Sequence, residues 1–215
     1  MFGAGSLCYA EIKLDGSLGG SQGQDISKVG NEFTIRADMG QQRDNNLFHS
    51  FGKFNLSAGE IATFNDSGAA GLVDRVFARI TGGASNINGT LRTQFNNTQP
   101  DLYLINPQGI IFGQNAKLDV QGSFHASTSN FIQFEDGVRF NATTPERESN
   151  ELLSNAPPSA FGFLDTSQGE IKISGSDLRV LEGQSLSLIA NKTKIISGKF
   201  EAVNGHINIR QIAPK

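Results

Sequence analysis

Apolar pairs recur at a nearly constant spacing through the carboxyl-terminal part of the chain. Successive pairs lie about seven or eight residues apart, so three pairs span about 22 residues, a length typical of solenoid repeats. The pairs are Ile171 with Ile173, Leu178 with Val180, Leu186 with Leu188, Ile195 with its neighbours, Phe200 with Ala202, and Ile207 with Ile209. We predict that each pair marks one short strand and that strands and turns wind into triangular coils.

A single coil of this kind cannot bury its inward side chains, so the repeat predicts a stack of coils. Stacked coils pair backbone to backbone at about 4.8 Å and close a continuous apolar column. Inward and outward positions alternate along a strand, which fits Ile171-Lys172-Ile173. We expect Ile171 to stack under Ile195 and Leu186 under Ile207. Turn residues are then expected at the coil corners: Gly175, Gly183, Gly198 and Gly205.

The composition favours an all-β chain with many turns. Gly occurs 25 times and Pro 6 times, so Gly, Asn and Asp must make most turns, since they tolerate positive φ or hydrogen-bond their own backbone. Further alternating runs lie at 32–35 and 76–80, and no segment shows sustained helical periodicity. We therefore predict an all-β fold, a right-handed parallel β-helix. A β-sandwich is the alternative, and it would favour hairpin dipeptides between strands.

The spacing of Phe48, Phe51 and Phe54 could suggest one face of a helix. Their neighbours Gly52 and Asn55 favour a path of strands and turns instead. We expect the three rings to lie in or near the core.

Three segments lie outside the regular pattern. The segment from Ile12 to Ile35 is expected to cap the open edges at one end of the stack. The polar stretch near 135–163, with Pro157-Pro158, is expected to leave the stack as an excursion, with a small hairpin or one helical turn. Residues 1–10 are expected to be the remains of a leader or an artificial start. Residues 11–215 are then predicted to form one domain, a fragment of a longer chain whose coils continue.

Charge, hydropathy and cysteine content exclude several classes. The net charge is −3 and Lys and Arg are scattered singly, which argues against a nucleic-acid partner. No apolar run approaches the roughly 20 residues that span a bilayer, so no stable membrane insertion is expected. Cys8 is the single cysteine, so an intrachain disulfide is impossible, and we interpret its thiol as incidental.

The five residues Asn106-Pro107-Gln108-Gly109-Ile110 predict a tight turn. Pro107 fixes φ near −65° at the second turn position, and Gly109 can accept a positive φ. Ile110 then enters the next strand. The turn could serve only as a corner between coils, or it could be exposed and read directly by a partner. Both roles could hold in part, since a misfolded corner would also abolish recognition.

The segment from Asp101 to Phe134 resembles the two-partner secretion (TPS) domain of the filamentous haemagglutinin family of exoproteins. The family's marker Asn-Pro-Asn-Gly-Ile is matched by residues 106–110, with Gln108 as the departure. Residues 46–51 resemble cyanobacterial versions of the domain. Further matches lie at 15–19, 79–83, 111–113, 122–128 and in Ser85-Asn86-Ile87-Asn88-Gly89.

This resemblance implies a secretion signal without chemistry. The domain would be recognised in the periplasm by the POTRA domains of a cognate outer-membrane β-barrel transporter, and export of the exoprotein would begin there. The implied protein is secreted or displayed at the cell surface, is monomeric and needs no cofactor. The residues expected to carry recognition or to shape the site are Asn106, Pro107, Gln108, Gly109, Ile110, Asn86, Asn88 and Gly89. If the side chain at position 108 were itself the recognition element, glutamine in place of the family's asparagine would put recognition by the transporter in doubt.

Two other functions are weighed against the secretion signal. A polysaccharide-active β-helix enzyme would need acidic clusters for Ca²⁺ or paired carboxylates, and the acids here are dispersed, as at Asp119, Asp136, Asp165 and Asp177. No catalytic residue is therefore expected. The spacings of His49, His125 and His206 match no local metal-ligand pattern, so no metal is expected either. The second alternative is an adhesin module that binds glycans directly.

Overall fold

The computed structural model describes residues 10–18, 23–143, 153–164 and 169–212. Within them the chain is all-β, with one short 3₁₀ turn, η1 (Ala37–Met39). An eight-stranded sheet contains β1 (Glu11–Leu14), β4 (Gln41–Arg43), β5 (Asn46–Asn55), β7 (Arg75–Ile80), β10 (Asp101–Ile105), β13 (Phe124–Ser127), β18 (Leu186–Ala190) and β20 (Ile207–Gln211).

The other strands form two further sheets. A nine-stranded sheet contains β2 (Lys28–Val29), β3 (Glu32–Arg36), β6 (Ile61–Asn65), β8 (Ser85–Ile87), β9 (Thr90–Gln94), β11 (Ile110–Phe112), β12 (Lys117–Asp119), β17 (Glu170–Val180) and β19 (Lys192–Ala202). A three-stranded sheet contains β14 (Phe131–Phe134), β15 (Arg139–Asn141) and β16 (Pro158–Gly162).

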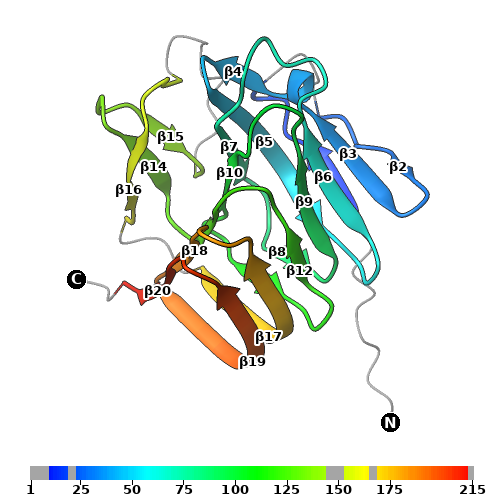
Figure 1. Cartoon of the computed structure of the whole chain (residues 1–215), viewed down its shortest axis with the longest axis vertical. Coiled ribbons are helices and arrows are strands. Elements are labelled where there is room, and N and C mark those ends of the chain that lie inside the picture. Colours follow the sequence, from blue (N-terminus) through cyan, green and yellow to red (C-terminus); the bar gives the residue numbers. More distant parts are fainter. Residues whose placement is uncertain (1–9, 19–22, 144–152, 165–168, 213–215) are drawn as a thin grey trace.

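The two large sheets curl around each other as the faces of a parallel β-helix, which confirms the predicted fold class (Figure 1). One face is the parallel series β5-β7-β10-β13-β18-β20. A second face holds β8 and β11, and a third holds β6, β9 and β12. The long strands β17 and β19 bend across both of these faces, which is why the two faces form one sheet.

Each coil places its inward residues directly over those of the coil before it. Leu47 pairs with Val76, and this column continues through successive coils to Leu186 and Ile207. The expected stacking of Leu186 under Ile207 is therefore confirmed. The inward side chains are buried along most of the column and form one continuous apolar core.

The expected stacking of Ile171 under Ile195 is wrong. Ile171 pairs with Thr193, and Ile195 pairs with Ile173. The error arises because an inward position of β19 holds the polar residue Thr193, so a count of apolar residues passes over it. The register of the backbone ladder, rather than the nearest apolar residue, decides which side chains stack.

The rings of Phe48, Phe51 and Phe54 are all buried on β5, as expected for a strand path. Phe51 and Phe54 face the inside of the helix, where their ring centroids lie 5.1 Å apart. Phe48 faces outward and stacks on Phe77, which in turn stacks on Tyr103, with centroid separations of 5.0 and 4.8 Å. The outward row is therefore a ladder of aromatic rings running across three coils.

The three-stranded antiparallel sheet covers this outward ladder. Ile132, Phe134 and Phe140 belong to the same buried cluster as Phe48 and Phe77. The sheet lies between β13 and β17 in the sequence, around the segment predicted to leave the stack (Figure 1). Residues 144–152 of that segment lie outside the described residues. The described part of the chain therefore has two apolar cores, one inside the coils and one on an outer face.

The segment from Ile12 to Ile35, expected to cap the stack, contributes strands to both large sheets. β1 pairs antiparallel with β5, and Ile12 and Leu14 reach the inner core. β3 pairs in parallel with β6, and β2 folds back on β3 as a short hairpin. The edges of β5 and β6 that would otherwise be open are thus covered by backbone pairing.

Arg79 joins three parts of the fold through a fully buried side chain. Its guanidinium donates to the hydroxyl oxygens of Ser50 at 2.7 Å and Ser17 at 2.9 Å, and to the carbonyl oxygen of Asn141 at 2.6 Å. The guanidinium carbon also lies 4.7 Å from the centroid of the Phe140 ring. One side chain therefore ties together the amino-terminal segment, β5 and the three-stranded sheet.

Replacing Arg79 tests this connection. Arg79→Met keeps the apolar stem but leaves buried acceptors without a donor, so we expect the free energy of unfolding to fall by about 3 kcal/mol. Urea unfolding followed by circular dichroism measures the loss. The control is Arg36→Met, because Arg36 is exposed and forms a surface ion pair with Asp38; its loss should be much smaller than that of Arg79→Met, since exposed ion pairs contribute little to stability. Equal losses for the two variants would contradict the role assigned to Arg79.

His49 is a titratable group placed in the inner core. It lies on β5 opposite Ala78, and among the described residues neither ring nitrogen has a hydrogen-bond partner. Burial lowers the pKa of His49 to about 3, although the nearby charge of Asp38 acts in the opposite direction. The imidazole is therefore neutral in the folded protein.

This burial predicts a loss of stability in acid. The pKa of His49 in the folded protein lies below the unfolded value of about 6.5. The contribution of the neutral imidazole to the free energy of unfolding is therefore fully present above pH 6.5 and is lost as the pH drops toward 3. Between pH 7 and pH 5 we expect His49 to cost about 2 kcal/mol of unfolding free energy. His49→Leu should remove that part of the dependence in urea titrations at both pH values. Burial also lowers the pKa of His125, so some dependence should remain. An unchanged slope in the variant would show that His49 is not the group involved.

Candidate functional site

The Asn106–Ile110 segment forms the turn that joins β10 to β11. The backbone N–H of Gly109 donates to the carbonyl oxygen of Asn106 at 3.0 Å and closes the turn, with Pro107 at its second position. Gly109 has a φ of +119°, which a side chain would strain. The predicted turn and the predicted need for Gly at position 109 are both present in the structure.

The side chain of Asn106 is fully buried and makes three hydrogen bonds within the fold. Its Nδ2 donates to the carbonyl oxygen of Gly83 at 3.1 Å and to the hydroxyl oxygen of Ser85 at 3.0 Å. Its Oδ1 accepts from the backbone N–H of Gln108 at 2.9 Å. Asn106 therefore closes its own turn and fastens it to the preceding coil, with no polar atom facing solvent.

The turn is also packed closely against the following coil. A Cβ at position 109 would lie 3.1 Å from the carbonyl oxygen of Glu170, and a Cβ at Gly169 would lie 2.4 Å from the carbonyl oxygen of Pro107. Ile110 is buried in the core and pairs with Ile171 on this side. Three coils therefore meet at this corner, and glycine on each side permits the approach.

Gln108 is the exposed member of the five residues. Its backbone N–H closes the turn onto the Asn106 side chain, so the short side-chain bond that this corner requires comes from position 106. Glutamine in place of the family's asparagine at 108 therefore leaves the shape of the turn intact.

Asn88 and Gly89 lie at the corner between β8 and β9, and Asn86 lies within β8 itself. The backbone N–H of Asn86 donates to Asn55 Oδ1 at 2.8 Å, and Asn88 Oδ1 accepts from the backbone N–H of Asn115 at 3.0 Å. A Cβ at Gly89 would lie 2.3 Å from the carbonyl oxygen of Glu60. These residues too link one coil to the next.

The two groups of predicted site residues lie on neighbouring coils of one sheet. Asn86 pairs directly with Ile111 in the β8–β11 ladder, and Ser85 accepts from Asn106 beside it. Gly83 and Ser85 belong to stretches that match the family pattern but were not predicted as site residues, and Gly169 was not predicted at all. Gly169 has no local signal, because only the pairing of β11 with the distant strand β17 brings it to the turn.

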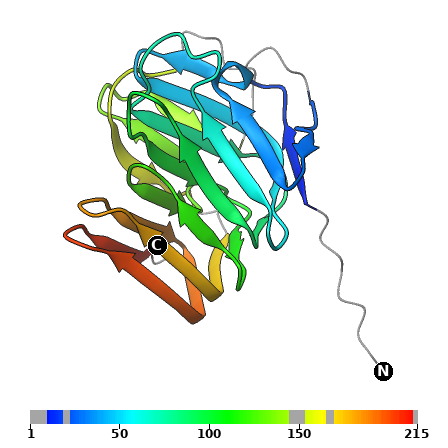
Figure 2. The same cartoon turned by 45° about the vertical axis from the view of Figure 1, so that its right-hand side comes forward.

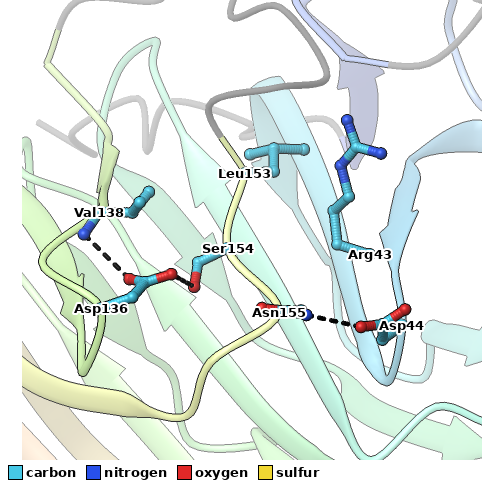
Figure 3. Close-up of a pocket in the computed structure, with 7 residues that line it drawn as sticks. All are labelled: Arg43, Asp44, Asp136, Val138, Leu153, Ser154 and Asn155. Atoms are coloured by element: carbon cyan, nitrogen blue, oxygen red, sulfur yellow. Dashed lines mark hydrogen bonds between the residues drawn. The ribbon is translucent and has the colours of Figure 1, made fainter.

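A pocket of about 400 Å³ lies elsewhere, where the β4–β5 turn meets the three-stranded sheet and the segment after residue 152 (Figure 3). Asp136 accepts from Ser154 Oγ at 2.6 Å, and Asp44 accepts from Asn155 Nδ2 at 2.6 Å. Both carboxylates are thus engaged within the fold. The guanidinium of Arg43 points away from them in the figure and forms no ion pair with any residue that the structure describes.

The histidines do not converge on one another. His49 is inside the coils, His125 stacks on the Tyr103 ring with centroids 4.4 Å apart, and His206 is exposed near β20. Over the described ranges, no three His, Cys, Asp or Glu side chains come together as metal ligands would. Cys8 lies outside the described residues. The described part also holds no helix of the length and apolar character that crosses a bilayer.

The buried bonds of Asn106 predict a structural cost for its removal. Asn106→Ala leaves the Ser85 hydroxyl and the N–H of Gln108 without their partner, so the free energy of unfolding should fall by about 2 kcal/mol. Gln108→Ala is the matched control, two positions further along the same turn and exposed, and should change the free energy of unfolding by less than about 0.5 kcal/mol. Thermal or urea unfolding of the two variants compares them directly. A stable Asn106→Ala protein would contradict the structural role.

Comparison with known proteins places this geometry in a family. No curated protein matches the chain. The model of the TPS secretion domain, however, matches residues 10–215, which include both corners and every coil described above. The chain therefore belongs to the family of TPS secretion domains, the secretion signal of two-partner secretion, in which an exoprotein crosses the outer membrane with the help of a partner transporter.

Proposed function

We propose that this domain is recognised in the periplasm by the POTRA domains of its outer-membrane β-barrel transporter, and that this contact starts export of the exoprotein. The domain acts as a monomer and performs no catalysis. The family match supports the secretion role. The burial of the Asn106 side chain indicates that the motif shapes the turn rather than contacting the transporter. The cyanobacterial likeness of residues 46–51 stays a prediction.

Within this proposal the Asn106–Ile110 motif works by shaping the corner. The side chain of Asn106 is not accessible to a partner, because it is buried and its amide group is hydrogen-bonded to Gly83, Ser85 and Gln108. Of the five motif residues, Gln108 is the exposed one, so it is the one that a transporter could contact directly. Loss of Asn106 would therefore affect recognition through misfolding of the junction between coils.

Recognition itself is proposed to use strand edges. A parallel β-helix that is only partly wound exposes long rows of backbone N–H and C=O groups, to which a strand or edge of a POTRA domain can add. The register of β7, β10 and β13 means that each unfolded coil uncovers the next such edge. Strand addition of this kind depends on the backbone more than on particular side chains.

Titration of labelled protein with purified POTRA domains tests the proposal. Wild-type protein and Gln108→Ala should bind within about twofold of each other, since an exposed position removed from the edges contributes little. The affinity of Asn106→Ala should differ from that of the wild-type protein only under conditions in which the variant is partly unfolded. Circular dichroism measures the unfolding. A loss of binding in fully folded Gln108→Ala would make the turn a direct contact. If the wild-type protein does not bind the POTRA domains in either its native or its partly unfolded state, the transporter proposal is wrong.

Enzymatic and glycan-binding functions have less support. Two acidic side chains, Asp44 and Asp136, line the pocket in Figure 3, and both are held by neighbouring side chains. A hydrolytic pair would need one free base and one free acid facing a substrate bond. We therefore propose a binding signal rather than a catalyst.

A further inference from the structure

His49 is a buried base that takes no part in the corners or in the outer core. Its side chain is fully buried, and neither ring nitrogen has a hydrogen-bond partner among the described residues. The imidazole lies 6.0 Å from the ring centroid of Phe51 and 5.6 Å from that of Phe64, and Ala78 is its neighbour on β7. None of these side chains accepts a hydrogen bond from an imidazolium. The position therefore accommodates the neutral ring and offers nothing to a protonated one.

One short segment packs directly on the imidazole. We call residues 37–43, which comprise η1 and β4, the cover. Figure 2 shows this blue part of the chain at the end of the stack opposite to the last coil. A Cβ at Gly40 would lie 2.8 Å from His49 Nδ1 and would also collide with the carbonyl oxygen of Phe48. The backbone of the cover, rather than a side chain, therefore lies against the ring nitrogen.

Few interactions hold the cover in place. β4 has three residues, all half-buried, and pairs with β5 alone among the described strands. Gln42 fastens its outer side to the loop before β7, where Nε2 donates to the carbonyl oxygen of Leu72 at 3.0 Å and Oε1 accepts from the N–H of Ala70 at 2.8 Å. Segments with few buried apolar contacts and exposed hydrogen bonds open at a lower free energy than the whole domain. The cover has both properties.

The charged groups around His49 lie on the side of the cover. Asp38, on η1, is the acid whose charge favours the protonated imidazole. Its carboxylate is partly exposed and accepts from Arg36 Nε at 2.9 Å. Arg43, on β4, lines the pocket of Figure 3 instead, and Asp66, in the turn after β6, is hydrogen-bonded to the loop after β9. A protonated His49 can therefore gain water and the Asp38 carboxylate once the cover moves away from the ring.

We propose that the cover is an acid-triggered switch: protonation of His49 opens residues 37–43 while the rest of the stack stays wound. Opening releases the backbone edge of β5 from Asn46 to Phe48, which β4 pairs with in the closed state. The switch is a property of the domain alone and goes beyond the transporter proposal, so either can fail without the other.

The direction of the switch follows from the burial of the ring. Burial lowers the pKa of His49 to about 3 in the closed state, whereas a hydrated imidazole has a pKa of about 6.5. The closed state is therefore fully favoured above pH 6.5, and its advantage is lost as the pH falls toward 3. Between pH 7 and pH 5 the opening constant should rise about 25-fold.

Hydrogen exchange of the whole protein, followed by mass spectrometry at pH 7 and pH 5, tests the switch. After correction for intrinsic exchange rates, the opening constant of the cover should show the expected rise. This opening should hardly depend on low concentrations of urea, because a local opening exposes little surface. β10 should stay better protected than the cover at both pH values. Equal opening constants at the two pH values, or exchange of the cover only through unfolding of the whole domain, would overturn the proposal.

The two buried histidines provide a matched pair of variants. His49→Leu replaces the imidazole by an apolar side chain and should reduce the pH response of the cover to less than about twofold. His125→Phe keeps an aromatic ring on Tyr103 and should leave the response of the cover unchanged, although burial lowers the pKa of His125 as well. The same loss of response in both variants, or no loss in His49→Leu, would contradict the assignment to His49.

A glycine pair tests the cover without any titration, and it serves even if His49→Leu does not fold. Gly40→Ala places a Cβ against the imidazole and the backbone of β5, so the cover should already open several-fold more often at pH 7. Gly71→Ala is the control in the neighbouring loop, because the nearest atom to its Cβ would be Gln42 Nε2 at 3.9 Å, an ordinary contact. Equal opening of the cover in the two variants would show that Gly40 does not hold it closed and would overturn the proposal.

Discussion

Backbone pairing between successive coils is the interaction on which the rest of this structure depends. It fixes which residue of one coil lies over which residue of the next, so inward side chains form columns and outward side chains form rows. The apolar core, the aromatic ladder and the corner hydrogen bonds all follow that register. Thr193 illustrates its strength, because a polar residue is carried into an inward position over Ile171 once the ladder has set the alignment.

The outward rows determine what can be attached to the stack. Phe48, Phe77 and Tyr103 would be an exposed apolar strip on a bare coil face, and the three-stranded sheet buries them. Arg79, in a neighbouring outward row, fastens this sheet and the amino-terminal segment to the same face. The excursion from the stack is thus an integral part of the fold, with a core of its own.

The family marker has a physical meaning in this arrangement. Asn106 lies where three coils converge, and its amide satisfies donors and acceptors on two of them. The geometry of this junction exists only when neighbouring coils are in register. The exposed Gln108 can differ from the family's asparagine because its backbone N–H, rather than its side chain, completes the turn.

The sequence by itself determined the fold class, the strand path through Phe48, Phe51 and Phe54, the tight turn at residues 106–110 and the stacking of Leu186 under Ile207. Each of these follows from local alternation or turn chemistry, which a short stretch of chain encodes. The tertiary structure alone decided that Ile171 lies over Thr193, that Gly169 packs on Pro107 and that Arg79 joins three segments. Those contacts link residues far apart in the chain, and only the register of the assembled ladder brings them together.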